Sequence, residues 1–146
     1  MGNLISIAQR KKSRSLMEEL STSVISFSNG VGSDFRGKNK GKRQVTILTE
    51  ESWNTTSKIY GKKIPWTVRR ANLFISGFDL ENSKGKKLVI GDVQLEITGE
   101  LKPCNRMDEQ LEGLTEILTF NWRGGVCCKI ISEGVVSIGD PISLID

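Results

Sequence analysis

Apolar residues recur with a period of two on both sides of Gly91-Asp92, and this pattern constrains the fold of the chain more than any other feature. Apolar residues occupy every second position in 88–90 before the turn and in 93–97 after it. This period of two is typical of strands with one buried face, and the Gly-Asp pair between the two runs predicts a tight hairpin. The chain therefore contains an antiparallel sheet with a buried side.

Short apolar runs recur along the chain, and most are bounded by Gly, Asn or Pro. We expect two helices, one that Thr49 caps and Gly61 ends, and one over 107–118, where apolar residues recur at helical spacing. Many short strands with two or three short helices favour a mainly β fold, a compact β-barrel. The length of 146 residues predicts a single domain spanning 1–146. The further strands are predicted at 3–8, 23–28, 45–48, 72–76, 125–131, 135–138 and 141–145.

Histidine is absent, and this excludes several mechanisms at once. The chain cannot form a Ser-His-Asp triad, a Cys-His dyad or a His-ligated zinc site, and we expect no zinc, no haem and no metal ligands. No apolar run approaches the roughly 20 residues that span a bilayer, and no secretory signal is visible, so we expect no membrane partner and a cytoplasmic location. The three cysteines are odd in number and two are adjacent, which indicates reduced thiols.

Basic residues are concentrated in the first part of the chain. Residues 1–65 contain 12 basic and 5 acidic side chains, whereas residues 66–146 contain 9 basic and 12 acidic ones. Glycine lets backbone N–H groups approach an anion, and arginine binds phosphate oxygens in pairs, so the glycine-rich loop 30–43 predicts an anionic ligand. A mobile, solvated basic loop is the alternative. The basic side chains of this loop are Arg36, Lys38, Lys40, Lys42 and Arg43.

Two further segments contribute candidate anion contacts. Arg69 and Arg70 precede the strand predicted at 72–76, and adjacent residues entering a strand point to opposite faces. Arg70 then shares a face with Asn72, and whichever arginine faces inward needs an anion. A pair of surface arginines is the alternative. Arg123 precedes a double glycine and is a further candidate contact.

Cys104 follows a proline at the end of a predicted strand and precedes the second predicted helix. The helix N-terminus and the neighbouring Lys102 and Arg106 favour a thiolate, which could attack a substrate, carry sulfur or bind a soft metal. A small buried cysteine without a role is the alternative. Cys127 and Cys128 alternate through another predicted strand, and we expect one to be in the core and the other half-exposed.

In this order the segments resemble the MOSC domain, which is named after the C-terminal part of molybdenum cofactor sulfurases. The resemblance covers nearly the whole chain, and it is strongest to the small stand-alone members of the family. It implies a compact, β-strand-rich barrel. No single motif is specific, whereas the ordered set is. This set consists of Gly32–Asp34, Arg36-Gly37, Arg43–Thr46, Arg69–Leu73, Ile90–Asp92, Ile97–Gly99, Pro103-Cys104, Arg123–Gly125 and Ile138–Asp140.

The resemblance also implies a function. The family's cysteine handles sulfur or binds a molybdenum-pterin cofactor, and by motif match it falls on Cys104, the expected catalytic residue. The family's contacts to the cofactor phosphate fall on Arg70 and Asn72, and Thr46 is assigned only a structural role. We therefore expect an anionic, molybdopterin-type cofactor. The candidate residues for binding it are Arg36, Arg43, Arg70, Asn72, Arg106 and Arg123.

One position departs from the family pattern. In the amidoxime-reducing relatives the metal-ligating cysteine is the second of a Cys-x-x-Cys pair, and here Met107 occupies that position. A thioether cannot become an anion or carry a persulfide, so sulfur transfer through Cys104 or cofactor binding without ligation is what remains. The chain has no domain with a pyridoxal-phosphate lysine, so a cysteine desulfurase is the expected sulfur donor. Without imidazole, protons would have to come from carboxylates such as Asp108 or from the cofactor.

Two other functions are compatible with the sequence. The basic first part and four aromatic residues would suit a small nucleic-acid-binding barrel, because stacking and a basic groove together bind single strands. Nucleic acid is the less favoured partner, and the aromatic residues concerned are Phe35, Trp53, Trp66 and Phe74. An interaction module without chemistry is the other alternative; it would copurify with no cofactor and would tolerate Cys104→Ala.

Overall fold

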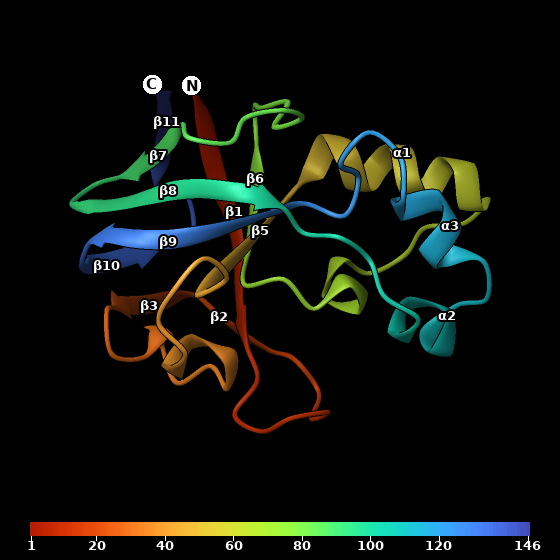
Figure 1. The fold of residues 1–146 in the computed structure, drawn as a ribbon, viewed down its shortest axis with the longest axis horizontal. Coiled ribbons are helices and arrows are strands. Elements are labelled where there is room, and N and C mark those ends of the chain that lie inside the picture. The colour runs from red at the N-terminus through yellow and green to blue at the C-terminus, as the bar shows by residue number, and fades with distance from the viewer.

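The computed structural model describes residues 1–146, and its main element is a closed barrel of seven strands (Figure 1). The strand β1 pairs with β11, which closes the barrel and places Gly2 opposite Ile142. The prediction of a mainly β barrel is therefore confirmed. Around the barrel the order is β11 (Pro141–Ile145), β7 (Lys87–Ile90), β8 (Val93–Glu100), β9 (Val126–Ser132), β5 (Val45–Thr49), β6 (Leu73–Ser76) and β1 (Gly2–Gln9).

A smaller sheet and one parallel pair complete the strand pattern. The second sheet contains β10 (Gly134–Ser137), β3 (Thr22–Ser26) and β4 (Gly30–Val31), and β2 (Glu18–Leu20) extends the barrel sheet beyond β1. All strand pairs are antiparallel except β5 with β6, which a helix connects. Each predicted strand overlaps an observed one, whereas the short strands β2 and β4 have too few residues to give a periodic signal.

The predicted hairpin around Gly91 is present. Ile90 pairs with Val93 across a two-residue turn, and Gly91 has a φ of 59°, a conformation that glycine adopts without strain. The alternating apolar residues of both strands are fully buried. The period of two therefore correctly predicted which residues of these two strands face the barrel interior.

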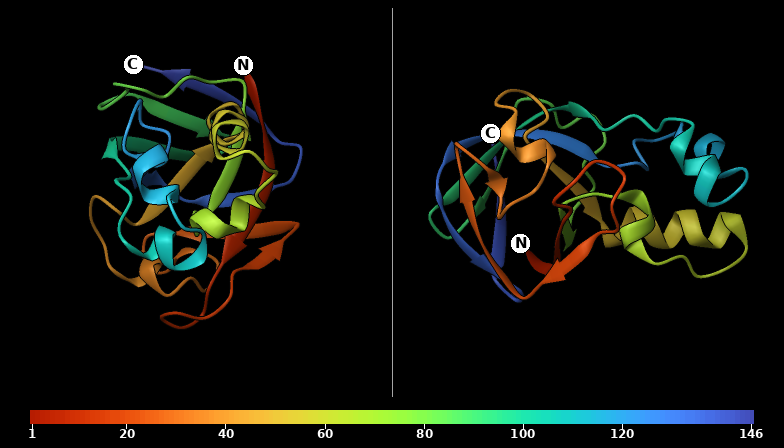
Figure 2. Two further views of the ribbon diagram at one scale, coloured as in Figure 1. Left: turned by 90° about the vertical axis from the view of Figure 1, so that its right-hand side faces the viewer. Right: turned by 90° about the horizontal axis from the view of Figure 1, so that it is seen from below.

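Three helices lie together on one side of the barrel (Figure 2). The helix α1 (Glu50–Tyr60) begins after Thr49, whose Oγ1 accepts a hydrogen bond from the Ser52 N–H at 3.1 Å, and it ends at Gly61. The single helix predicted over 107–118 is wrong. It is two short helices, α2 (Arg106–Gln110) and α3 (Leu114–Leu118), because Gly113 adopts a φ of 88° between them.

The structure has two hydrophobic cores, one inside the barrel and one between the barrel and the helices. Along β5, Ile47 belongs to the first core and Leu48 to the second, so both faces of this strand are covered. Trp53, Trp66 and Phe74 are buried in the second core, where the rings of Trp66 and Phe74 stack at 5.1 Å. These three aromatic side chains are therefore not exposed for stacking with nucleic acid bases, contrary to that alternative.

No helix of the structure has the length and apolar character that crossing a membrane requires.

Candidate functional site

Seven basic side chains line one cavity of about 280 Å³ beside α2. Asp34 is the only carboxylate among the lining residues, and Cys104 lies at the same cavity. The ion pairs of the structure, Lys86–Asp146 and Lys129–Glu96, involve none of the basic lining residues. The cavity therefore concentrates positive charge that no protein carboxylate pairs with, which suits an anionic ligand. The seven basic residues are Arg10, Arg36, Arg43, Arg69, Arg70, Lys102 and Arg106.

Asp34 organises the loops on one side of this cavity and forms no ion pair with its guanidinium groups, although its charge partly offsets the lowering of the pKa of Arg10 and Arg70. Its side chain is 2 % exposed, and its two oxygens accept hydrogen bonds from the backbone N–H groups of Arg10 at 2.9 Å and Arg36 at 3.2 Å. The Phe35 N–H in turn donates to the Arg10 carbonyl at 2.6 Å. These bonds tie the loop 30–43 to the end of β1, so arginines from both segments reach the same cavity.

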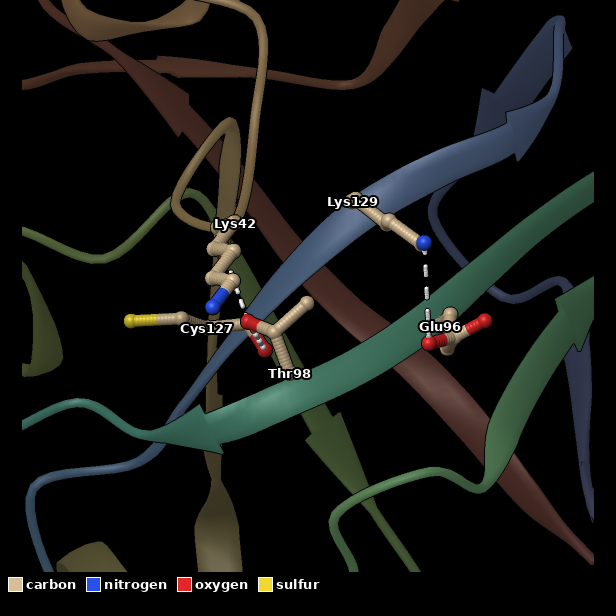
Figure 3. A network of polar contacts seen from close by, with 5 residues as sticks. All are labelled: Lys42, Glu96, Thr98, Cys127 and Lys129. Carbon is tan, nitrogen blue, oxygen red and sulfur yellow. Dashed lines mark hydrogen bonds and ion pairs between the residues drawn. The ribbon is translucent and has the colours of Figure 1, made fainter.

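The end of the loop 30–43 is anchored to the barrel (Figure 3). The Thr98 hydroxyl on β8 lies within hydrogen-bonding distance of the Lys42 carbonyl and of the Cys127 carbonyl. Thr98 and Cys127 lie on β8 and β9, and the ion pair between Lys129 and Glu96 joins these two strands farther along. Because Lys42 directly precedes Arg43, this anchor fixes the backbone from which Arg43 reaches the cavity.

Arg69 and Arg70 do not alternate into a strand as the sequence suggested. A 3-10 turn over Trp66–Arg69 ends at Arg69, and Arg70 adopts a left-handed conformation with a φ of 67° before β6 begins at Leu73. The Arg69 side chain is 6 % exposed. The Nη2 of Arg70 donates to the Ser15 carbonyl, and its buried Nε has no hydrogen-bond partner. Arg70 lines the cavity, and its Nε–H is a donor that the fold itself leaves unsatisfied.

Asn72 also lines the cavity, but most of its amide group is used within the fold. Its Oδ1 accepts hydrogen bonds from the Thr46 N–H and hydroxyl, and its Nδ2 donates to the Ala8 carbonyl at 3.2 Å. One N–H of the side chain is left for a ligand. Asn72 therefore joins β1, β5 and β6 and contributes at most one contact to the cavity.

Burial and neighbouring positive charges lower the pKa of three arginines that line the cavity. Burial lowers the pKa of Arg69 to about 10, and it lowers the pKa of Arg70, with Arg106 as the next cause. The pKa of Arg10 is lowered by burial and then by Arg70. All three remain cationic at neutral pH, and a bound anion would relieve part of this unfavourable charge.

The three cysteines differ in accessibility, and none forms a disulfide. Cys104 is exposed, and its carbonyl accepts hydrogen bonds from the Met107 N–H at 3.0 Å and the Thr115 hydroxyl at 3.1 Å. Cys127 and Cys128 are both buried, so the expectation that one is half-exposed is wrong. Cys128 belongs to the core inside the barrel, and the Cys127 thiol lies 3.9 Å from the Glu100 carbonyl oxygen at the end of β8, whereas Lys129 and Ile131 farther along β9 are exposed. Burial raises the pKa of both buried thiols.

The cavity brings together Cys104 and five of the six candidate binding residues, and Arg123 lies elsewhere. Arg123 lines a separate cavity of about 560 Å³ beside the start of α1, and its Nη1 donates to the Ile117 carbonyl. The sequence did not single out Arg10 or Asp34 as cavity residues, and it named Arg69 only together with Arg70 as a candidate anion contact. Arg10 lies two residues after the first predicted strand and directly follows the observed β1, which is a position where a side chain can reach the end of a barrel.

The carboxylate of Asp108 is not at the cavity. Its Oδ1 accepts a hydrogen bond from the Thr115 N–H at 2.8 Å, and this bond lowers the pKa of Asp108. Asp108 therefore satisfies a backbone N–H in the first turn of α3 and does not line the cavity at which Cys104 lies.

Fold and site together define a small β-barrel with a basic, cysteine-bearing cavity. A family model described as the MOSC domain matches residues 23–143, and the chain belongs to the MOSC domain family. Solved structures share this fold: the YuaD protein from Bacillus subtilis (TM-score 0.84, 19% identity) covers 99% of this chain over 96% of its own length. YiiM from Geobacillus stearothermophilus (TM-score 0.78, 15% identity) covers 100% of this chain over 76% of its own. YiiM from Escherichia coli (TM-score 0.73, 13% identity) covers 99% of this chain over 70% of its own length. The comparison with curated proteins gives no match.

Proposed function

We propose that the cavity binds a phosphate-bearing, molybdopterin-type cofactor and that Cys104 is its sulfur-carrying or cofactor-facing residue. The observation that carries this proposal is the set of seven basic side chains around the exposed Cys104, none of them in an ion pair with a carboxylate. Membership of the MOSC domain family supports the class of cofactor.

The residues present fit an anionic group. Arg70 has an unpartnered, buried Nε, and Arg36, Arg43 and Arg106 line the same cavity from separate segments. These side chains would bind phosphate oxygens, with Asn72 offering one amide N–H. Met107 stands where a second cysteine would be needed for metal ligation of the Cys-x-x-Cys type, so we assign no metal ligand. When bound, such a cofactor would supply the redox or sulfur chemistry.

A sulfur-carrying role would proceed by thiolate attack. The Cys104 thiolate would attack the terminal sulfur of a persulfide on a cysteine desulfurase. The S–S bond of the donor breaks, its cysteine leaves as a thiolate, and Cys104 gains one sulfur atom as a persulfide. The reaction needs no added oxidant, and it needs Cys104 exposed, as it is. Three unpaired thiols support a reducing compartment such as the cytoplasm.

Mass spectrometry after incubation with a cysteine desulfurase and cysteine tests the sulfur role. Wild-type protein should gain one labile sulfur atom, and Cys104→Ser should gain none. Equal gain by both proteins would refute a carrier role for Cys104.

Purification from cells that make the molybdenum cofactor tests the binding role. The pterin released on oxidation is measured by its fluorescence. Arg70→Ala should copurify with much less pterin than wild type, whereas Arg123→Ala, outside the cavity, should match wild type. Equal or absent pterin in wild type and Arg70→Ala would count against the cofactor, and would favour an interaction module.

A further inference from the structure

Arg69 is a buried arginine that the proposed function counts among the basic lining residues without giving it a contact of its own. No carboxylate lies within ion-pairing distance of it. Its hydrogen bonds go to backbone carbonyls and to one sulfur atom: Nε donates to the Gly124 carbonyl at 2.8 Å and Nη2 to the Leu101 carbonyl at 2.7 Å. Its Nη1 lies 3.9 Å from the Met107 sulfur. One guanidinium thus contacts three separate positions of the chain.

Two of these partners enclose Cys104 in the sequence. Leu101 lies three residues before it and Met107 three residues after it. Arginine presents its donors in a rigid plane, so bonds to both ends restrict the path of the segment between them. The hydrogen bonds of Cys104 itself involve its carbonyl. The place of its thiol therefore depends on how the backbone of 101–107 is held.

The third partner, Gly124, packs tightly against the same group. A Cβ at this position would lie 2.7 Å from the Leu101 carbonyl oxygen and 3.0 Å from Nη2 of Arg69. Arg69, Leu101 and Gly124 therefore leave no room for a side chain between them. The left-handed Arg70 that follows gives the two arginines different partners, because Arg69 bonds the Leu101 carbonyl and contacts the Met107 sulfur, whereas Arg70 donates to the Ser15 carbonyl. Both side chains line the cavity.

We propose that Arg69 is the positioning residue of this site, which holds the segment 101–107 against Gly124 and thereby sets the place of the Cys104 thiol beside the anion-binding arginines. The inference rests on the proposed function, because it needs an anion in the cavity. Arg69 also lines that cavity, so its charge acts on the same anion. With its pKa lowered to about 10 it is still protonated at neutral pH.

Alkylation of native protein by iodoacetamide, followed by intact mass, tests the proposal with inorganic phosphate as the probe. Cys127 and Cys128 are buried, so the fast-reacting thiol is Cys104. Phosphate in the cavity should slow alkylation of the wild type, and the ratio of the two rates is the protection factor. In Arg69→Gln, which loses both the planar fork and the charge, the protection factor should fall about fivefold. Arg69→Lys keeps the charge and should recover part of the loss.

Arg123→Gln is the matched control, because Arg123 also donates to a backbone carbonyl but lies outside the cavity. Its protection factor should equal that of the wild type. Wild-type protection in folded Arg69→Gln would overturn the role of Arg69 and leave the proposed function standing. Absence of phosphate protection in the wild type would refute the anion site, and the inference with it. Should Arg69→Gln fail to fold, Arg69→Lys decides, and a protection factor equal to the wild type overturns the proposal.

Discussion

Thr46 and Asn72 hydrogen-bond to each other in both directions. The Thr46 N–H donates to Oδ1 of Asn72 at 3.1 Å, and the Asn72 N–H lies 3.2 Å from the Thr46 hydroxyl oxygen. Both residues are buried at the edge of the cavity, where Asn72 also donates to Ala8 on β1. This reciprocal pair ties three barrel strands together just behind the basic cavity.

Asn72→Ala should destabilise the fold. The change leaves the buried Thr46 N–H and the Ala8 carbonyl without their partners, so the free energy of unfolding should fall by about 2 to 4 kcal/mol. Urea denaturation measures this. Asn54 on α1 is exposed and makes no side-chain hydrogen bond in the structure, so Asn54→Ala should change stability by less than about 0.5 kcal/mol. An equal change in the free energy of unfolding for the two variants would contradict the role of Asn72 in joining the barrel strands.

Gly125→Ala should cost more stability than Gly139→Ala. Both glycines have a positive φ, of 102° and 96°, so both changes carry a similar backbone cost of about 1 to 2 kcal/mol. A Cβ at Gly125 would lie 2.2 Å from the Ile47 carbonyl oxygen, whereas nothing lies within 4 Å of one at Gly139. The thermal midpoint of Gly125→Ala should therefore be clearly lower. Similar thermal midpoints of the two variants would mean that the backbone near Ile47 shifts to make room for the added Cβ.

The free energy of unfolding should fall as the pH rises above about 9. Burial raises the pKa of Cys127 and Cys128 above the ordinary value of 9.0 for a thiol, so the unfolded chain loses these protons before the folded one does. Each thiol can contribute a slope of about 1.4 kcal/mol per pH unit in that range. Cys128→Ala should show a shallower slope in urea titrations at several pH values. An unchanged slope would assign the alkaline loss to other groups.

Asp108→Asn should destabilise the docking of α3 at neutral pH. The Thr115 N–H lowers the pKa of Asp108, so the charged form is favoured in the folded state. The stabilisation is present above the unfolded pKa and is lost as the pH falls through the lowered one. The gap in thermal midpoint between wild type and variant should therefore close in acid. A gap that persists at low pH would indicate that charge is not involved.

Local signals in the sequence predicted those elements that local contacts determine. The hairpin at Gly91 and the helix between Thr49 and Gly61 follow from alternation and capping, and both are present. The break at Gly113 needed the tertiary fold, because helical spacing continues across it. Similarly, propensity did not reveal that Arg70 is left-handed, so the strand alternation predicted for Arg69 and Arg70 was wrong.

The candidate site was predicted in part, because its segments are far apart in the sequence. The glycine-rich basic loop marked Arg36 and Arg43, the neighbourhood of Cys104 marked Arg106, and the barrel brings all three to one cavity. Arg123 has the same residue type and a glycine neighbourhood, yet it faces another cavity. Only the path of the backbone after α3 decides this, and no local pattern encodes it. The burial of Cys127 likewise depends on tertiary contacts, because Lys129 and Ile131, at alternate positions of the same strand, are exposed.

The pairing of β1 with β11 has a consequence for what happens when the barrel is incomplete. The two strands are nearly the whole chain apart, and each is also bonded to another neighbour, β6 and β7 respectively. Without residues 141–145 the barrel would present unpaired backbone along both β1 and β7. Open strand edges of this kind pair readily with other chains. A nascent or clipped molecule would therefore be prone to self-association, whereas the closed barrel has no such edge at this seam.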